Sequence, residues 1–199
     1  MIIIGVTGSI GSGKSHFCKV FAKNKGVKFL SSDEQVHKIY AKDRDLFKQI
    51  ANNFPTAIIE DKIDRKILGD IVFQDSAKKK QLENIVYPIL AHHRKKFINN
   101  AKRSGAKIVL LEIPLLFENG LNAECDYAVT LYCSPLIQKA RVMKREGMTE
   151  EKFANIVKTQ MPVSQKIRLS DFAINTGNSK KFTSQAAKGL YIALSELFF

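Results

Sequence analysis

The residues of this chain best suited to chemistry lie in one short stretch near its start, Gly8-Ser-Ile-Gly-Ser-Gly-Lys-Ser15. Its glycines allow backbone conformations that turn successive N–H groups toward one point, where they can bind an anion. Lys14 adds a cation on a long side chain, and the Ser15 hydroxyl can ligate a divalent metal ion. An apolar run precedes the stretch and an amphipathic helical pattern follows it, as a phosphate-binding loop requires. We therefore expect the nucleotide contacts of this chain to come from Gly8, Gly11, Ser12, Gly13, Lys14, Ser15 and His16.

Two carboxylates stand where apolar runs end. Asp33 lies just beyond the run Val27–Ser31, and Glu112 directly follows the run Lys107–Leu111, at the end of that predicted strand. Ligands of parallel sheets bind outside the carboxyl ends of the strands, so we expect both carboxylates near the phosphate loop. Glu112 can then hold Mg²⁺ together with Ser15. Asp33 can accept the proton of a hydroxyl group or can cap a helix, and its position alone leaves both interpretations open.

A basic segment later in the chain can supply mobile cations. Arg141 and Arg145 are four residues apart in "QKARVMKREG", which predicts that they share one face of a helix. A second short helix is expected to follow, capped by Thr149 and with Pro162 near its end. Such a pair of helices can close as a lid over a transferring phosphoryl group, and a solvated basic face is the alternative. The phosphate loop elsewhere in the chain favours the lid.

The elements that must position these residues are readable as alternating strands and helices. Five short apolar runs predict strands of a parallel sheet: Met1–Thr7, Val27–Ser31, Lys107–Leu111, Tyr127–Cys133 and Asp171–Asn175. Helical patterns cover Lys14–Lys25, Ser76–Ala101 with an interruption at Pro88, and Thr183–Phe198. The alternation predicts an α/β fold of three layers, of the P-loop nucleotide-binding type, around a five-stranded parallel sheet.

The tract from Asp33 to Arg103 is too long for one crossover helix, so we expect it to form an inserted helical substrate subdomain. The predicted organisation is a single domain whose core comprises about residues 1–32, 105–140 and 168–199. The helical subdomain would cover about residues 33–104, and the lid about residues 141–167.

Composition and charge limit which partners and which cellular compartment we expect for this chain. Its 199 residues carry a formal net charge of +13, which suits nucleic acid, anionic lipid or a small polyanionic substrate. No apolar run approaches the roughly 20 residues that cross a bilayer. The first apolar run lacks the basic residues of a signal peptide, and the three cysteines lack disulfide or zinc spacing. We therefore expect a cytoplasmic protein with no membrane partner, acting as a monomer or weak homo-oligomer.

Several classes of protein use a phosphate loop. A GTPase should show an NKxD sequence, but Asn24-Lys25 is followed by Gly-Val. A motor or helicase usually needs a longer chain. A nucleotide-gated nucleic-acid-binding protein is suggested only by the net charge, because the sequence contains no recognisable nucleic-acid-binding motif. A small-molecule kinase needs an acceptor pocket, a group that handles the hydroxyl proton, and cations that close over the site. The residues favour the kinase, with nucleosides and nucleoside monophosphates still open as acceptors.

Several segments together resemble the dephospho-coenzyme A kinase family, which performs the last step of coenzyme A synthesis. The resemblance spans nearly the whole chain and rests on the order of "TGSIGSGKS", "DRKILGDIVF", "VYPIL", "IPLLFENG", "QKARVMKREG", "TQMP" and "DFAINTG". It implies a core of five parallel strands with a helical substrate subdomain and a lid. It also implies transfer of the ATP γ-phosphate, with Mg²⁺, to the ribose 3′-hydroxyl of dephospho-CoA and no nucleic-acid partner.

The resemblance also implies roles for individual residues. Asp33 matches the family's proposed base, and Arg141 and Arg145 match its lid arginines. Asn175 and Gly177 match a segment near the ATP adenine. The dephospho-CoA side would include Arg65, Leu115 in the pocket wall, and Glu118, which can bind substrate or cap a turn.

Three residues depart from the usual family pattern. Ser31 stands where an Asp-x-Asp pair often begins, Tyr87 replaces a common histidine before a proline, and His16 replaces a common threonine. We expect no catalytic role for His16. None of the three changes removes a group that the chemistry requires.

Overall fold

The computed structural model describes residues 1–198 and divides into two compact units. We call residues 1–32 together with the described residues from Ala101 onward the core unit. Residues 33–100 form the inserted unit. Each unit has its own hydrophobic core and is described by itself.

A five-stranded parallel sheet with strand order β2-β5-β1-β6-β7 organises the core unit. Its strands are β1 (Ile2–Thr7), β2 (Val27–Ser31), β5 (Ile108–Glu112), β6 (Tyr127–Tyr132) and β7 (Phe172–Asn175). All five predicted strands are confirmed, with ends that differ from the expected ones by one residue at most. β1 lies at the centre, and its Val6 pairs with Glu112 on one side and Val129 on the other. The loop that leaves β1 therefore emerges between the ends of two neighbouring strands.

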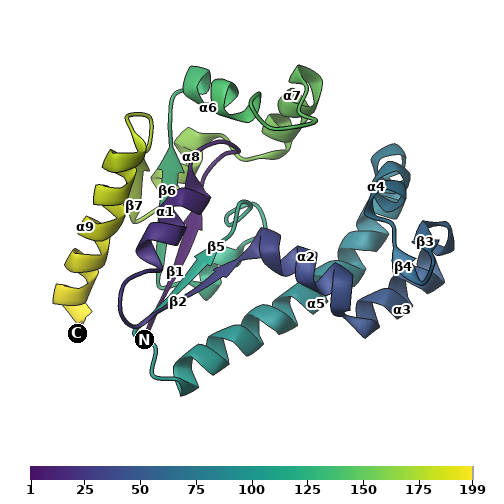
Figure 1. Cartoon of the computed structure of the whole chain (residues 1–199), viewed down its shortest axis with the longest axis horizontal. Helices are drawn as coiled ribbons and strands as arrows, with labels where there is room; N and C mark the ends of the chain where they lie inside the picture. Colours follow the sequence, from purple (N-terminus) through teal and green to yellow (C-terminus); the bar gives the residue numbers. More distant parts are fainter. Residues whose placement is uncertain (199) are drawn as a thin grey trace. The chain divides into compact units, whose positions relative to one another are not determined.

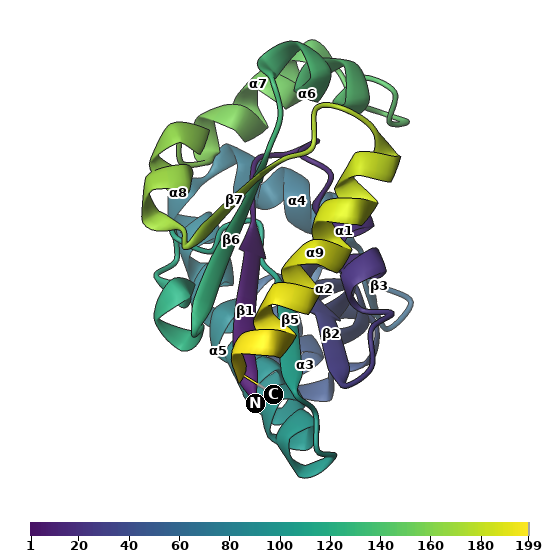
Figure 2. The same ribbon diagram turned by 90° about the vertical axis from the view of Figure 1, so that its left-hand side faces the viewer.

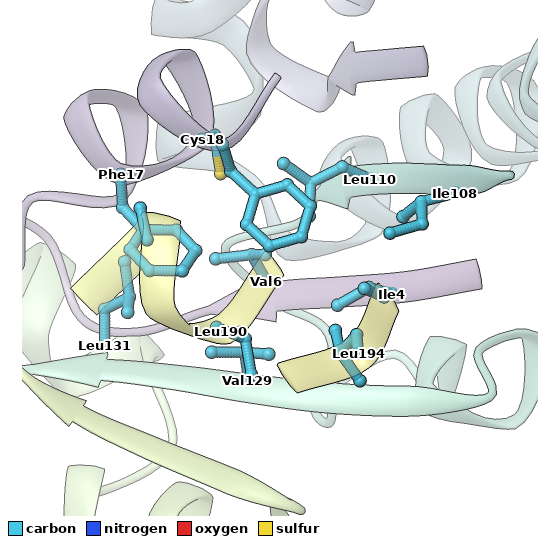
Figure 3. Close-up of a cluster of buried hydrophobic side chains, with 12 residues drawn as sticks. Ile4, Val6, Phe17, Cys18, Ile108, Leu110, Val129, Leu131, Leu190 and Leu194 are labelled. Atoms are coloured by element: carbon cyan, nitrogen blue, oxygen red, sulfur yellow. The ribbon is translucent and has the colours of Figure 1, made fainter. Parts of the chain in front are cut away.

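Two helices cover one face of this sheet. They are α1 (Lys14–Phe21) and α9 (Lys180–Phe198), which Figures 1 and 2 show running side by side. Figure 3 shows their side chains meeting those of the central strands, among them Val6, Phe17, Cys18, Leu110, Val129, Leu190 and Leu194. Because alternate residues of a strand point to opposite faces, Thr130 of β6 faces away from this cluster and contacts α8 (Val163–Leu169).

The predicted extent of α1 was too long at its carboxyl end. The helix ends at Phe21, because the Asn24 side chain and backbone both donate to the Phe21 carbonyl oxygen. Gly26 then takes a left-handed conformation with φ of +80°, which turns the chain into β2.

Three helices follow β6 where two were expected. They are α6 (Pro135–Val142), α7 (Glu150–Thr159) and α8, and Thr149 caps α7 as predicted. α6 and α7 lie beyond the end of the sheet to which the parallel strands point (Figures 1 and 2). α8 was missed because it is only 7 residues long and begins directly after Pro162. A short 3₁₀ helix, η2 (Leu121–Glu124), precedes β6.

The inserted unit is mainly helical. Its elements are α2 (Ser32–Lys42), α3 (Arg44–Asn53), η1 (Pro55–Ala57), β3 (Ile58–Ile59), β4 (Lys62–Ile63), α4 (Arg65–Gln74) and α5 (Ser76–Arg103). The β3–β4 hairpin within this helical tract was not foreseen from the sequence. Its turn residues, Glu60 and Asp61, have φ of +46° and +56°. Tight hairpin turns are normally recognisable in a sequence by Asn-Gly or Asp-Gly, and this turn contains neither pair.

The expected interruption at Pro88 was also wrong. α5 runs through Pro88, although proline cannot donate a hydrogen bond to the Asn84 carbonyl, a loss that costs about 3 kcal/mol in a helix interior. Ile85 and Val86, on the turn before it, are buried in the core of the inserted unit, and this packing offsets the cost. No helix among residues 1–198 has both the length and the apolar composition needed to cross a membrane.

Candidate functional site

The phosphate loop connects β1 to α1, and glycine is required at both of its ends. Gly8 has φ of +143°, and a Cβ atom there would collide with the Leu131 carbonyl oxygen. Gly13, the N-cap of α1, has φ of +83°, a left-handed conformation that other residues adopt only with strain. The loop thus delivers its last N–H groups to the amino end of α1, where the helix dipole favours an anion.

Lys14 bends back over this loop. Its Nζ atom donates to the carbonyl oxygens of Gly8 at 2.8 Å and Ser9 at 3.0 Å. The Ser12 N–H also donates to Ser9, at 3.1 Å, while the buried Ser12 Oγ has no partner among the described residues. The Lys14 ammonium therefore lies across the loop where phosphate oxygens would bind, while the Ser12 hydroxyl is enclosed within the loop.

Glu112 lies at the end of β5, as the sequence predicts, and its side chain reaches the loop. The Ser15 hydroxyl donates to Glu112 Oε1 at 2.7 Å, and Glu112 is only 3% exposed. A hydroxyl and a carboxylate are oxygen ligands that Mg²⁺ prefers. Within residues 1–198 no group of three or more His, Cys, Asp or Glu side chains is placed to hold a metal ion. The pair therefore fits a Mg²⁺ ion that takes its remaining ligands from phosphate and water.

Arg141 is anchored between the loop and the end of β7. Its Nη2 atom donates to the Thr176 carbonyl at 2.7 Å, and Nη1 contacts Gly11 O at 3.4 Å and Thr176 Oγ1 at 3.3 Å. Thr176 in turn donates to the Ser12 carbonyl at 2.7 Å. Arg145 does not share the face of Arg141, because α6 ends at Val142 and Arg145 lies exposed in the following turn. The expectation of one helical face was wrong for this reason.

A buried ion pair lies behind the loop. The ammonium of Lys166, a fully buried residue of α8, contacts Glu118 Oε1 and the Pro114 carbonyl, both at 2.8 Å, and Thr7 Oγ1 at 3.4 Å. Burial lowers the pKa of Lys166, while Glu118 opposes that shift. Glu118 Oε1 also accepts from the Met161 N–H at 2.7 Å. This network joins α8 to the ends of β1 and β5.

Two cysteines near the loop are held as thiols by their surroundings. Burial raises the pKa of Cys18, on α1, and the charge of Glu112 raises it further. Burial also raises the pKa of Cys133, although the Arg141 guanidinium opposes that shift. Neither environment activates a thiolate nucleophile.

The residues expected on the nucleotide side lie near the same end of the sheet. His16 Nε2 contacts the Lys180 carbonyl at 3.2 Å and Ser184 Oγ at 2.9 Å, so its ring docks on α9. Asn175 ends β7, and its Oδ1 accepts from the Gly177 N–H at 2.8 Å. A Cβ on Gly177 would lie 2.9 Å from that same oxygen, so glycine allows this tight turn.

Residues of the "PLLF" segment divide between the core and the surface. Leu116 is fully buried, and a Cβ on Gly5 would lie 3.0 Å from one of its methyl groups. Leu115 is half-buried. Leu115 is therefore free to line a pocket, whereas Leu116 is not.

The inserted unit begins with Asp33. This residue is exposed and is the second residue of α2, so it lies inside the first turn rather than at the N-cap position before the helix. It follows Ser31 by two residues, and Ser31 ends β2 in register with Glu112. The capping interpretation of Asp33 is therefore not supported.

A cavity of about 560 Å³ lies wholly within the inserted unit. Its lining combines two aromatic rings with five basic and two acidic side chains: Tyr40 and Phe47, then His37, Lys42, Arg44, Lys62 and Arg65, then Asp43 and Asp61. The basic side chains outnumber the acidic ones. The Arg65 guanidinium lies 5.4 Å from the centre of the Tyr40 ring, and its Nη1 is 2.7 Å from His37 Nδ1. Aromatic faces beside several cations suit a ligand that carries both a ring and negative charge.

Sequence reasoning missed Lys166, Gln160 and Thr176. Lys166 is one of 32 lysines and arginines, and nothing in its neighbours signals burial. Gln160 and Thr176 lie inside "TQMP" and "INTG", so the order of those segments was the only available signal.

Comparison with known proteins supplies an independent line of evidence. A family model described as "CoaE: Dephospho-CoA kinase" matches residues 2–181. A dephospho-CoA kinase of Agrobacterium fabrum is 42% identical over 178 residues, which cover 89% of this chain and 90% of that protein. One from Bartonella quintana is 40% identical and covers 93% of this chain and 94% of that protein. The solved structure of a dephospho-CoA kinase from Campylobacter jejuni superposes with a TM-score of 0.71 at 30% identity, covering 98% of this chain and 97% of that one.

Proposed function

This chain belongs to the dephospho-CoA kinase family, whose reaction, phosphoryl transfer from ATP to dephospho-CoA, completes coenzyme A biosynthesis. We propose which of its residues take part in this reaction, and what each one does. The observation that carries the proposal is the loop whose Ser15 hydroxyl donates to Glu112 while Lys14 lies across its carbonyl oxygens. A loop, a lysine and an oxygen pair in this arrangement suit the triphosphate of ATP.

On the donor side, the loop N–H groups would hold the β- and γ-phosphates. Lys14 would exchange its contact with Gly8 for a phosphate oxygen, while the Ser9 carbonyl would continue to hold its ammonium. Ser15 and Glu112 would hold Mg²⁺, which neutralises the charge that develops on the phosphates during transfer. Asn175 and Gly177 would border the adenine, and His16 would support α1 against α9.

On the acceptor side, Asp33 would accept the proton of the ribose 3′-hydroxyl and orient that oxygen toward the γ-phosphate. Its exposed position at the start of α2, just after a strand of the parallel sheet, supports this role. Arg65 and the basic cavity around it would bind part of dephospho-CoA, whose diphosphate is anionic. Leu115 would contribute apolar surface.

Glu118 receives a different role from the expected one. Its Oε1 atom is occupied by Lys166 and the Met161 N–H, so we propose that it supports the site rather than binds substrate.

Arg141 and Arg145 would carry positive charge to the transferring group. Support for Arg141 is its direct contact with the loop carbonyl of Gly11. Support for Arg145 is its exposed side chain, in the turn directly after the helix that carries Arg141.

We also propose a cytoplasmic enzyme that works as a monomer or weak homo-oligomer. Cys18, Cys125 and Cys133 are all free thiols, as a reducing compartment allows.

Asp33→Asn tests the proposed base. We expect turnover of dephospho-CoA to fall by about 10²–10⁴-fold, with the KM for ATP little changed, because only proton acceptance is lost. Glu34→Gln is the matched control, since it removes an exposed carboxylate from the same turn of α2. Activity of Asp33→Asn within a fewfold of the control variant would refute the assignment.

A further inference from the structure

The peptide group between Ser9 and Ile10 is held from both sides. The Ile10 N–H donates to Gln160 Oε1 at 3.0 Å. The Ser9 carbonyl accepts from Lys14 Nζ at 3.0 Å and from the Ser12 N–H at 3.1 Å. In a planar trans peptide the N–H and the C=O point in opposite directions, so fixing one end fixes the other. The orientation of the Gln160 amide is thereby coupled to the carbonyl that holds Lys14.

Gln160 is itself well supported. It is the C-cap residue of α7, and its N–H donates to the Val157 carbonyl at 3.2 Å. The next residue, Met161, donates its N–H to Glu118, which pairs with the fully buried Lys166 of α8. Gln160 therefore extends toward the loop from a backbone that is fixed on both sides, and not from a free chain segment.

The Ile10 N–H has a distinct place among the loop donors. It points to a side chain from the α7–α8 link, 150 residues away in the sequence, and so is not available to a phosphate. A backbone N–H left without a partner in this partly buried position would favour rotation of the peptide. Rotation would turn the Ser9 carbonyl away from both Lys14 and Ser12.

We propose that Gln160 is a positioning residue for phosphoryl transfer, which sets the Ser9–Ile10 peptide and through it Lys14. The inference rests on the role given to Lys14 in the proposed function. It also makes the phosphate loop sensitive to the position of α7, because the same residue ends that helix. Gln160 touches neither substrate in this assignment and acts through the loop alone.

Gln160→Met tests the inference, because it keeps the length of the side chain and removes the acceptor. Gln165→Met, on exposed α8 surface one turn further on, is the matched control. Two quantities are measured on the full-length ¹⁵N-labelled chain: hydrogen exchange of the Ile10 amide, and kcat and KM with ATP and dephospho-CoA. Thermal unfolding of each variant verifies that it is folded.

For Gln160→Met we expect Ile10 exchange to rise and kcat to fall, each by about tenfold, with the KM for dephospho-CoA unchanged. The control should match the wild type in both. A variant with normal kcat, or with lowered kcat but wild-type Ile10 exchange, overturns the inference. If Gln160→Met does not fold, Gln160→Glu retains an acceptor oxygen and should keep Ile10 protected; loss of that protection also overturns it. If the wild-type chain were inactive on dephospho-CoA, the proposed function would be contradicted instead. Hydrogen exchange of the Ile10 amide does not depend on that function, so the two failures can be told apart.

Discussion

The Arg141 guanidinium donates from Nη2 to the Thr176 carbonyl oxygen at 2.7 Å and from Nη1 toward the Gly11 carbonyl at 3.4 Å. One side chain thus joins α6, the end of β7 and the phosphate loop. The contacts use two nitrogens of a rigid planar group, which a lysine ammonium cannot reproduce. Arg141 is therefore held over the loop by contacts from the protein itself.

Replacement of Arg141 by methionine should be costly. We expect Arg141→Met to lower kcat by on the order of 10³-fold, because the variant lacks the charge that we propose to face the transferring phosphoryl group. Steady-state kinetics with saturating ATP and dephospho-CoA measure the effect. Arg168→Met, at an exposed position of α8, should stay within about twofold of wild type. Equal activities for the two variants would exclude Arg141 from the reaction.

Removing one partner of the buried ion pair between Lys166 and Glu118 should cost more stability than removing both. Lys166→Met leaves the Glu118 carboxylate buried without its partner, so we expect a loss of about 3–5 kcal/mol in the free energy of unfolding. Replacing both residues by methionine removes both desolvation penalties and should recover most of that loss. Chemical unfolding of the wild type, both single variants and the double variant gives the four free energies of unfolding that this double-mutant cycle compares. A double variant as unstable as the sum of the single variants would show that the two residues act independently.

Asp43 should make the inserted unit sensitive to acid. Burial alone would raise its pKa, but hydrogen bonds from the Leu46 N–H and from His93, with the His93 charge, bring it below the usual 3.8. Because the folded pKa is the lower one, the carboxylate stabilises the fold above pH 3.8, and this contribution disappears as the pH falls through the folded pKa.

Asp43→Asn keeps an oxygen for the Asp45 and Leu46 N–H groups and removes the charge that faces His93. We expect the variant to unfold at a lower temperature than the wild type at pH 5, and the difference to shrink as the pH falls toward about 2.5. Thermal unfolding followed over this pH range tests it. A difference that does not change with pH would show that Asp43 acts only as a helix cap.

Prediction from the sequence succeeded where a residue's position in the fold follows from its neighbours in the chain. The loop residues, and Glu112 at the end of its strand, were found from local pattern, because glycine spacing and strand ends are local properties. The five strands followed from short runs of β-branched residues. Thr149 was recognised as a cap from its place before a helical pattern.

Prediction failed where a role depends on distant contacts or on weak local signals. Nothing near Lys166 distinguishes a buried lysine from a solvated one, since its partners Glu118 and Pro114 are 48 and 52 residues away. The contact of Gln160 with Ile10 spans 150 residues. The turn of the β3–β4 hairpin, Glu60-Asp61, contains neither glycine nor asparagine, so the sequence did not reveal it. Arg145 lies outside α6 because that helix ends at Val142, earlier than the sequence pattern predicts.

As a dephospho-CoA kinase, this chain transfers the γ-phosphate of ATP to dephospho-CoA. The most direct test incubates the chain with ATP and Mg²⁺ and a panel of acceptors that includes dephospho-CoA, nucleosides and nucleoside monophosphates. ADP release and product mass are followed for each acceptor. We expect dephospho-CoA to be converted to coenzyme A with one ADP released per product, and the other acceptors to remain unchanged. Turnover of a nucleoside or nucleotide without turnover of dephospho-CoA would contradict the account.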